Sequence, residues 1–276
     1  MEQTPLSHPT AEPDDRTFHR LGQTPGQAWT VTGDRISTVR SAPTPRPMPV
    51  AARPRAVEID LSRTALVAVD LQNDFLHDRG WFARAGRKGR APTAAIDRFA
   101  AACRAEGMPV IWLNWGLPPH AGHLPASTLF RGKPAPAATG YGETPAGSEQ
   151  GVLQAGSWGA ALVEGLTRAP SDFEVRKQRF SGFPDTELDS LLRNLRVDTL
   201  LFCGINTDRC VFETLTDAAA RGFDCILIED LCATVSPLEI EAAVIWLVHT
   251  LHGFVTTSEA IPFANPMQPV QGSPSP

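Results

Sequence analysis

The feature that most constrains the fold is an alternation, from Val57 onward, of short β-branched apolar runs with longer amphipathic stretches. Strands that are apolar on both faces and that alternate with helices are typical of a parallel sheet covered on two sides. We therefore expect an α/β fold with three layers, αβα, built around a parallel Rossmann-like sheet. The predicted strands are 64–70, 108–114, 172–177, 197–204 and 223–230, and the predicted helices are about 92–106, 186–195, 208–221 and 237–251.

Proline marks the two ends of the chain as different from its middle. Nine of the 25 prolines fall in residues 1–55 and five more follow Ile261. The sequence thus predicts a Pro-rich N-terminal arm (1–55), a folded domain (56–261) and a Pro-rich C-terminal tail (262–276). The arm either drapes over the domain or a neighbouring subunit, or is disordered. Its apolar anchors are Phe18, Leu21, Trp29 and Ile36.

Charge and cysteine content exclude several classes of protein. With 25 Lys plus Arg against 30 Asp plus Glu, the net charge of −5 predicts no attraction to nucleic acid or to an anionic membrane. The first residues lack a secretory signal and no apolar run is long enough to cross a membrane, so a cytoplasmic protein is expected. Five cysteines without CxxC spacing disfavour a disulfide framework and a structural zinc site.

A long segment, 115–160, interrupts the alternation with Pro, Gly and small polar residues. A loop of this length in a compact domain is usually a lid, a binding loop or a subunit contact.

Three residues of types that can act in catalysis follow the ends of predicted strands: Asp70, Lys177 and Cys210. In parallel sheets, binding and catalytic residues collect beyond the carboxyl ends of the strands. A thiol nucleophile, a carboxylate that exchanges its proton and an ammonium that holds the carboxylate are sufficient for amide hydrolysis. Simpler explanations exist for each: a turn-forming Asp, a solvated Lys and a small buried Cys.

The position of Cys210 favours function over simple burial. It falls in the first turn of the helix predicted at 208–221, where unpaired N–H groups and the helix dipole favour a thiolate. The same N–H groups can receive the oxyanion that forms when a carbonyl is attacked.

Three segments that carry these residues resemble the motif blocks of the isochorismatase-like cysteine hydrolases. They are VDLQNDF (69–75), RKQRFSGF (176–183) and GINTDRCV (204–211), and the resemblance covers about residues 60–254. It implies that Asp70, Lys177 and Cys210 form the family's triad. It also implies a cis peptide bond between Ile205 and Asn206, an oxyanion hole made by the amides of Asn206 and Cys210, and a homo-oligomer, a dimer or a tetramer.

Departures from the family pattern narrow the expected substrate. Nicotinamidases carry a metal-binding D-x-H segment where this chain has WLNWGLPP (112–119), and His120 and His123 nearby lie in a Pro/Gly-rich segment, so no metal or other cofactor is expected. Members that cleave isochorismate can lack the nucleophilic cysteine, whereas this chain keeps Cys210, which favours C–N hydrolysis. The chain looks closest to ureidoacrylate, biuret and N-carbamoyl hydrolases, and the candidate substrate-binding residues are Phe75, Asn114, Trp115, Tyr141, Trp158, Phe180 and Phe183.

The leading hypothesis is a cysteine amidohydrolase that cleaves a C–N bond of a small ureido, carbamoyl or amide compound through a thioester on Cys210. The alternatives are a nicotinamidase-like or isochorismatase-like hydrolase and a non-catalytic oligomeric scaffold. A redox pair of Cys203 and Cys210 is disfavoured, because one lies in a strand and the other in the next helix. The apolar helix 237–251 is a candidate subunit contact, although burial within its own subunit is the simpler explanation.

Overall fold

The computed structural model describes residues 19–22, 27–40, 42–87, 89–120, 122, 124–133 and 135–263. The chain divides after Thr44 into two compact units. The Pro-rich tail predicted at 262–276 lies almost entirely outside the described residues, as does Phe18 of the arm.

The N-terminal unit contains a small antiparallel sheet of its own. Strand β2 (Trp29–Val31) pairs with β1 (His19–Leu21) on one side and with β3 (Ile36–Ser37) on the other. The side chains of Leu21, Trp29 and Ile36 are exposed in it. Neither alternative drawn from the sequence anticipates this sheet.

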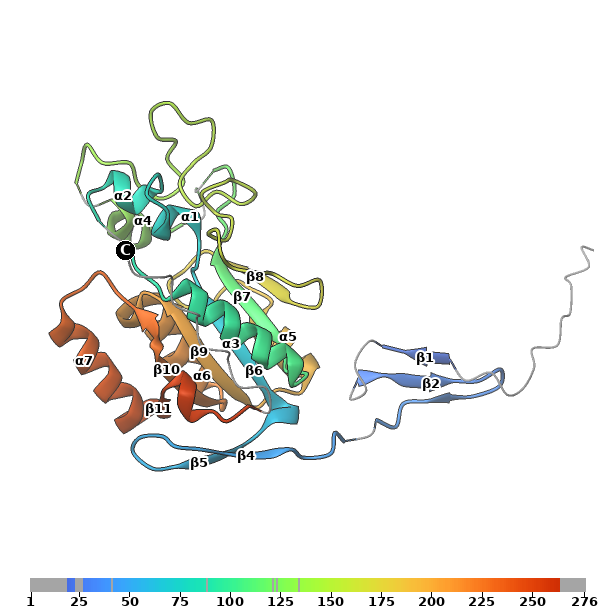
Figure 1. The fold of residues 1–276 in the computed structure, drawn as a ribbon. Coiled ribbons are helices and arrows are strands. Elements are labelled where there is room, and N and C mark those ends of the chain that lie inside the picture. The colour runs from blue at the N-terminus through green and yellow to red at the C-terminus, as the bar shows by residue number, and fades with distance from the viewer. Residues whose placement is uncertain are drawn as a thin grey trace, which may run out of the picture. The chain divides into compact units, whose positions relative to one another are not determined.

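The second unit is built on a six-stranded sheet in which every neighbouring pair of strands is parallel (Figure 1). The five predicted strands are all present, and the short sixth strand, β11, was not predicted. In spatial order the strands are β11 (Phe254–Thr256), β10 (Asp224–Ala233), β9 (Thr199–Ile205), β6 (Thr64–Val69), β7 (Val110–Trp115) and β8 (Phe173–Lys177).

Alternate residues of each central strand enter two separate apolar cores. In β6, Val67 and Val69 join a core that contains residues of α5 (Leu188–Leu195) and α6 (Phe212–Ala220). Leu66 and Ala68 face the other way, into a core with α3 (Thr93–Ala105), which crosses the front of the sheet in Figure 1. The predicted three-layer αβα architecture is therefore confirmed, since burial on both faces is what made the strands uniformly apolar.

The helix predicted at 208–221 is composite. A π-helical turn, Thr207–Val211, precedes α6. The helix predicted at 237–251 also has two parts, because α7 (Leu238–Leu247) continues into a π-helical turn at Val248–His252.

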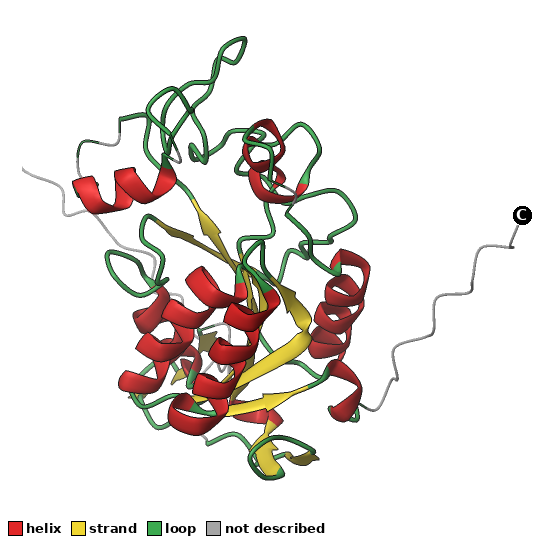
Figure 2. Ribbon diagram, turned by 90° about the vertical axis from the view of Figure 1, so that its left-hand side faces the viewer, coloured by secondary structure: helices red, strands yellow, loops and turns green. Residues whose placement is uncertain are grey.

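Short helices and long loops gather beyond the carboxyl ends of the central strands (Figures 1 and 2). They comprise α1 (Asn73–Leu76), α2 (Trp81–Arg84) and α4 (Ala126–Gly132), the last within the predicted long loop. The sequence predicts none of these three, because each is too short to show a helical period.

Residues assigned to the arm from the sequence take part in the second unit. Strand β4 (Pro47–Val50) forms an antiparallel hairpin with β5 (Val57–Asp60), and Val50 is fully buried. Arg53 bridges to Val255 of β11. Prolines fit β4 because a strand paired on one side leaves some N–H positions unused.

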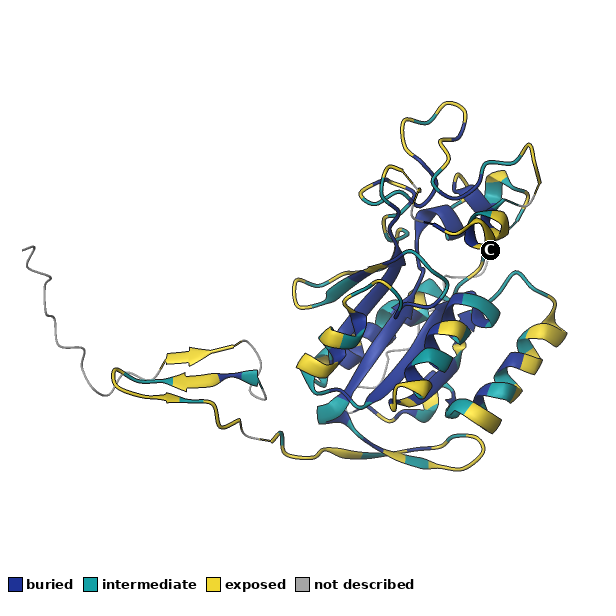
Figure 3. Ribbon diagram, turned by 180° about the vertical axis from the view of Figure 1, so that it is seen from behind, coloured by how far each residue is buried: buried dark blue, intermediate teal, exposed yellow. Residues whose placement is uncertain are grey.

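Helix α7 exposes much of its apolar surface, as the yellow bands in Figure 3 show. Leu238 is 77% exposed and Trp246 57%, whereas Val244 is buried. Burial within its own subunit, the simpler explanation drawn from the sequence, is therefore wrong for most of this helix.

Among the described residues, no helix is both long enough and apolar enough to cross a bilayer.

Candidate active site

The candidate catalytic residues follow three strands of the same sheet edge. Asp70 comes directly after β6, Lys177 is the last residue of β8, and Cys210 lies in the π-helical turn after β9. Asp70 has a φ of 55°, a left-handed conformation that Asp adopts more readily than most residues and that turns the chain out of the strand. Because the strands are parallel, these three ends meet at one edge of the sheet.

Asp70 and Lys177 form a buried ion pair. The Lys177 Nζ lies 3.0 Å from the Asp70 Oδ2, and the two residues are 0% and 1% exposed. Strand β7 separates their strands, and the lysine crosses it by passing over the ring of Trp115, with Nζ 4.1 Å from the ring centroid. Nζ also donates a hydrogen bond to the carbonyl of Arg179 at 3.2 Å. The ammonium is thus held by a charge, a ring face and a carbonyl.

Burial raises the pKa of Asp70, and the neighbouring charge of Lys177 opposes the shift, as do contacts with Cys210 and the Trp115 indole. A carboxylate with a raised pKa is a stronger base than an ordinary aspartate. The surroundings therefore suit Asp70 to take up a proton during a reaction.

Cys210 is 4% exposed and lies beside Asp70. Burial raises the pKa of its thiol, the Asp70 charge raises it further, and Lys177 opposes both effects. The sequence predicts the opposite direction from the helix terminus alone. Burial and the neighbouring carboxylate therefore oppose the effect expected from the helix terminus. These surroundings favour the thiol over the thiolate, so a base beside Cys210 would assist the sulfur by taking its proton.

The peptide bond between Ile205 and Asn206 is cis, as the family resemblance implies. Asn206 and Cys210, the two expected contributors to an oxyanion hole, both line the same cavity. The Asn206 side chain accepts a hydrogen bond from the Val235 amide at 3.2 Å, which ties this turn to the segment after β10.

This active-site cavity has a volume of about 360 Å³. Four of the predicted substrate-binding residues line it: Phe75, Trp115, Tyr141 and Phe180. The aromatic wall is continuous, because the Trp115 ring lies 4.9 Å from Tyr141 and 5.8 Å from Phe180. The sequence did not predict Trp81, Phe82, Arg87, Arg131, Arg209 and Glu213, which complete the lining.

The other three predicted substrate-binding residues lie outside the lining of this cavity. Asn114 precedes Trp115 in β7 and lines a different cavity with Glu174, because successive strand residues point to opposite faces. Trp158 is 43% exposed and lies against His77, with ring centroids 5.0 Å apart. Phe183 is buried under the Arg221 guanidinium, which lies 4.5 Å from its ring centroid.

Only one of the unpredicted lining residues left a usable sequence signal. Glu213 follows Cys210 by three residues, and this spacing places two side chains on the same face of a helix. Arg87 and Arg131 come from segments whose approach to Cys210 depends on tertiary contacts.

The QND part of the first motif fastens the long loop over the sheet edge. The Gln72 side chain donates to the carbonyls of Trp115 and Ala160 at 2.8 and 2.7 Å and accepts from the Trp115 amide at 2.9 Å. The buried Asp74 accepts hydrogen bonds from the amides of Trp81 and Leu153. These residues hold Trp115 and the loop in place, so Asp74 has a structural role at this edge.

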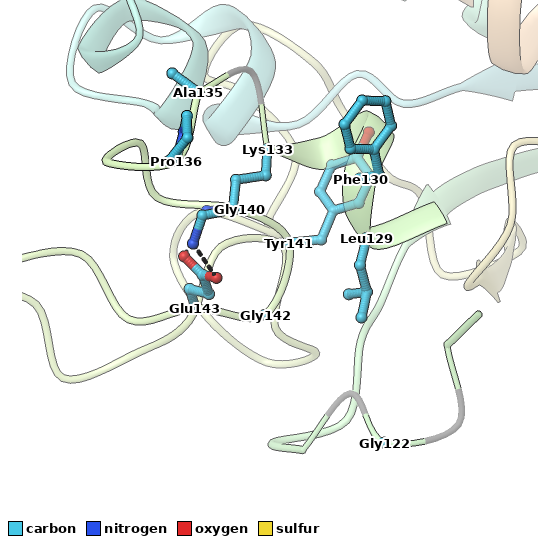
Figure 4. Close-up of a pocket in the computed structure, with 10 residues that line it drawn as sticks. All are labelled: Gly122, Leu129, Phe130, Lys133, Ala135, Pro136, Gly140, Tyr141, Gly142 and Glu143. Atoms are coloured by element: carbon cyan, nitrogen blue, oxygen red, sulfur yellow. Dashed lines mark hydrogen bonds and ion pairs between the residues drawn. The ribbon is translucent and has the colours of Figure 1, made fainter. Parts of the chain in front are cut away.

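A second cavity, of about 620 Å³, lies within the long loop and shares Tyr141 with the active-site cavity (Figure 4). Its wall includes Leu129 and Phe130. Lys133 and Glu143 also line it and form an ion pair, with 2.6 Å between Lys133 Nζ and Glu143 Oε1. No residue of the Asp70, Lys177 and Cys210 group lines it.

The side-chain positions bear on two further predictions, a redox cysteine pair and a metal site. All five cysteines are free thiols, so Cys203 and Cys210 form no disulfide. Within the ranges that the structure describes, no group of three His, Cys, Asp or Glu side chains is arranged to hold a metal ion. His123 lies outside those ranges.

Comparisons with known proteins agree with this arrangement. The family model for the isochorismatase domain matches residues 64–260. A ureidoacrylate amidohydrolase RutB of Methylobacterium radiotolerans is 36% identical over 211 residues, which cover 74% of this chain and 80% of that relative.

Solved structures show the same fold. An isochorismatase family protein of Desulfovibrio vulgaris superposes with a TM-score of 0.58 at 28% identity, covering 72% of this chain and 95% of that one. A cysteine hydrolase of Pseudomonas syringae superposes with a TM-score of 0.59 at 23% identity, covering 72% and 91%.

Proposed function

The chain belongs to the isochorismatase family, and from that premise we propose that it cleaves a C–N bond of a small ureido, carbamoyl or amide compound through a thioester on Cys210. It is a hydrolase that acts on C–N amide bonds, as its curated relatives, named ureidoacrylate amidohydrolases, support. The observation that carries the proposal is the buried pair of Asp70 and Lys177 beside the Cys210 thiol.

In the first half-reaction, the Cys210 sulfur attacks the substrate carbonyl carbon while its proton passes to the Asp70 carboxylate. The carbonyl oxygen becomes an oxyanion, for which the Asn206 and Cys210 amides are the proposed donors. When the C–N bond breaks, the proton on Asp70 moves to the departing nitrogen. The amine or ammonia leaves, and the carbonyl carbon remains bound to sulfur as a thioester.

In the second half-reaction, a water molecule attacks the thioester carbon and gives a proton to Asp70. The C–S bond breaks, the sulfur takes that proton back, and the acid product leaves. The Lys177 ammonium stabilises the carboxylate form of Asp70 between the two proton transfers. The raised pKa values of both acids fit this scheme, in which one proton is shared and no free thiolate accumulates.

The mechanism is tested by replacing the nucleophile. Cys210→Ala should lower ammonia release from ureido and amide substrates by about 10⁴-fold or more, because it removes the sulfur that forms the covalent intermediate. Cys103→Ala, which removes a buried thiol of α3, is the matched control and should retain activity. Acid-quenched wild-type enzyme should carry the acyl mass on the peptide that contains Cys210. Full turnover by Cys210→Ala would contradict the mechanism.

We also propose that the chain forms a homo-oligomer through the exposed apolar face of α7. Several large apolar side chains exposed on one helix are a common mark of a subunit contact, and this helix exposes Leu238, Ile240 and Trp246. Sedimentation of the wild-type protein should show a dimer or a larger assembly, and Leu238→Lys with Trp246→Lys should shift it to monomer. A wild-type protein that sediments as a monomer at high concentration would refute this.

A further inference from the structure

The active-site cavity has a charge opposite to that of the whole chain. The chain carries a net charge of −5, yet three arginines and one glutamate line this cavity: Arg87, Arg131, Arg209 and Glu213. The excess of positive charge lies within a cavity of about 360 Å³ whose lining is half aromatic, where charges are less screened than on an open surface. An anionic ligand suits such a cavity better than a neutral one.

Two of these guanidinium groups are available to a ligand. Within the described residues, Arg87 has no ion-pair partner, and it lies over the Phe82 ring at 5.6 Å. The Arg209 Nε lies 3.7 Å from the Asp208 carboxylate, which already accepts hydrogen bonds from the Thr234 and Ser236 hydroxyls. Arg87 thus has no counter-charge among the described residues, whereas Arg209 is partly compensated by Asp208, which it shares with two hydroxyls, and donates a hydrogen bond to the Ser236 hydroxyl at 3.3 Å.

Arg87 and Arg209 also lie together in space. Both also line a third space, a hollow beside the active-site cavity that Ser236 lines as well. The two arginines therefore lie where this hollow and the active-site cavity adjoin. Both guanidinium charges also act on the Tyr141 hydroxyl. Burial raises the pKa of this hydroxyl, and the two charges oppose that increase. The arginines thus come from two distant chain segments and lie where the active-site cavity adjoins this hollow, a place that we call the mouth of the cavity.

The one carboxylate of the lining lies near Lys177 of the buried ion pair. Glu213 follows Cys210 in the chain by three residues and interacts with the charge of Lys177, which partly offsets the burial that raises its pKa. The Trp115 indole N–H is also buried on that side, close to Asp70 and Cys210. The cavity therefore offers acceptor and donor groups near the catalytic cysteine and cations at its mouth.

We propose that Arg87 and Arg209, with Arg131 at the rim, form a carboxylate subsite, so that the substrate is a ureido or amide acid whose anionic end lies at the mouth. The C–N group then lies against Cys210, with its N–H groups toward Glu213. The planar fork of a guanidinium matches a carboxylate with two parallel hydrogen bonds. This proposal rests on the proposed function, since it assumes that the scissile group lies at Cys210.

The experiment separates binding from turnover. In the Cys210→Ala protein, calorimetry measures the dissociation constants of 3-ureidopropionate, which carries a carboxylate, and of butylurea, a neutral compound of similar length. We expect 3-ureidopropionate to bind more tightly. Arg87→Gln and Arg209→Gln should each weaken its binding by about 10- to 100-fold, the range expected for lost hydrogen bonds to a charged group. Butylurea binding should change far less.

Arg176→Gln is the matched control. It removes the same charge from an exposed side chain of β8. This side chain lines the separate cavity that contains Asn114, and it does not line the active-site cavity. It should leave the preference for 3-ureidopropionate intact. In enzyme that retains Cys210, the ratio of kcat/KM for the anionic and neutral compounds should fall in Arg87→Gln and Arg209→Gln but remain in Arg176→Gln.

Two different failures can be told apart. Equal binding of both compounds, or an anion preference that survives Arg87→Gln and Arg209→Gln together, would overturn the carboxylate subsite while leaving the hydrolase mechanism intact. Tight, arginine-dependent binding of 3-ureidopropionate with C–N cleavage that is independent of Cys210 would instead overturn the proposed mechanism and leave the subsite standing.

Discussion

The floor and the mouth of the active-site cavity hold charge in different ways. The floor consists of Asp70 and Lys177, which lie behind the cavity wall and outside its lining; they are almost completely buried and lie 3.0 Å apart, so each depends on the other. At the mouth, Arg209 is 37% exposed at its side chain and Arg87 has no acidic partner within the described residues. Buried pairs are costly to break, whereas exposed charges contribute little to stability. The floor is thus suited to chemistry and the mouth to selection.

Replacing the proton carrier at the floor should have the largest effect. Asp70→Asn removes the group that takes the thiol proton, and kcat should fall by about 10²- to 10⁴-fold, the range expected for general acid–base catalysis. Steady-state ammonia release measures the change, and the fold is checked by circular dichroism. Activity within a few-fold of wild type would mean that another base serves Cys210.

Breaking the ion pair from its other side should mainly affect stability. Lys177→Met leaves the Asp70 carboxylate buried without its cation and should lower the free energy of unfolding by about 3–5 kcal/mol. The double variant Asp70→Asn with Lys177→Met should recover much of that loss, because no uncompensated charge remains, yet it should stay inactive. Urea unfolding of both variants measures the difference. Equal destabilisation in the two would show that the charges are not coupled.

The pH dependence of kcat/KM should report on Asp70 at the floor and should be insensitive to the arginines at the mouth. Burial raises the pKa of Asp70, so its carboxylate takes up a proton at a higher pH than an ordinary aspartate does. As the pH falls, kcat/KM for a neutral ureido substrate should therefore decline earlier than an unperturbed Asp would require. Arg87→Gln should keep this acid limb in place, since a guanidinium does not titrate in that range. A profile flat down to the ordinary aspartate range would contradict the role of Asp70.

The rim should give the smallest effect. Arg131 lies on α4 with an exposed side chain, so Arg131→Gln should raise KM for an anionic substrate only about two- to five-fold at low salt. The difference should shrink as ionic strength rises, because solvent ions screen an exposed charge. Measuring KM at two salt concentrations tests this. A large, salt-independent effect would place Arg131 deeper in the subsite than the structure does.

The strands β6, β8 and β9 and the three polar residues at their ends could be predicted from the sequence. Buried parallel strands have a strong local signature, and their carboxyl ends meet at one edge whatever the loops between them do. Asp70, Lys177 and Cys210 are therefore brought together as expected. The cis bond before Asn206 was likewise implied by the short GINT segment.

Long-range contacts decided the rest. Asn114 faces away from the cavity because of strand parity, and Trp158 is held elsewhere by the loop that Asn73 fastens through the Trp158 carbonyl at 2.8 Å. Arg87 and Arg209 meet only because loops far apart in the chain fold over the same edge. The direction of the Cys210 pKa shift also depended on burial, which a sequence position does not reveal.

The sequence by itself determined the sheet and the identity of the reacting groups, because strand periodicity and the residues that end each strand are local properties. Only the tertiary structure decided which cations surround those groups and which way their pKa values move. Charge and desolvation act through space over distances that the chain order does not encode.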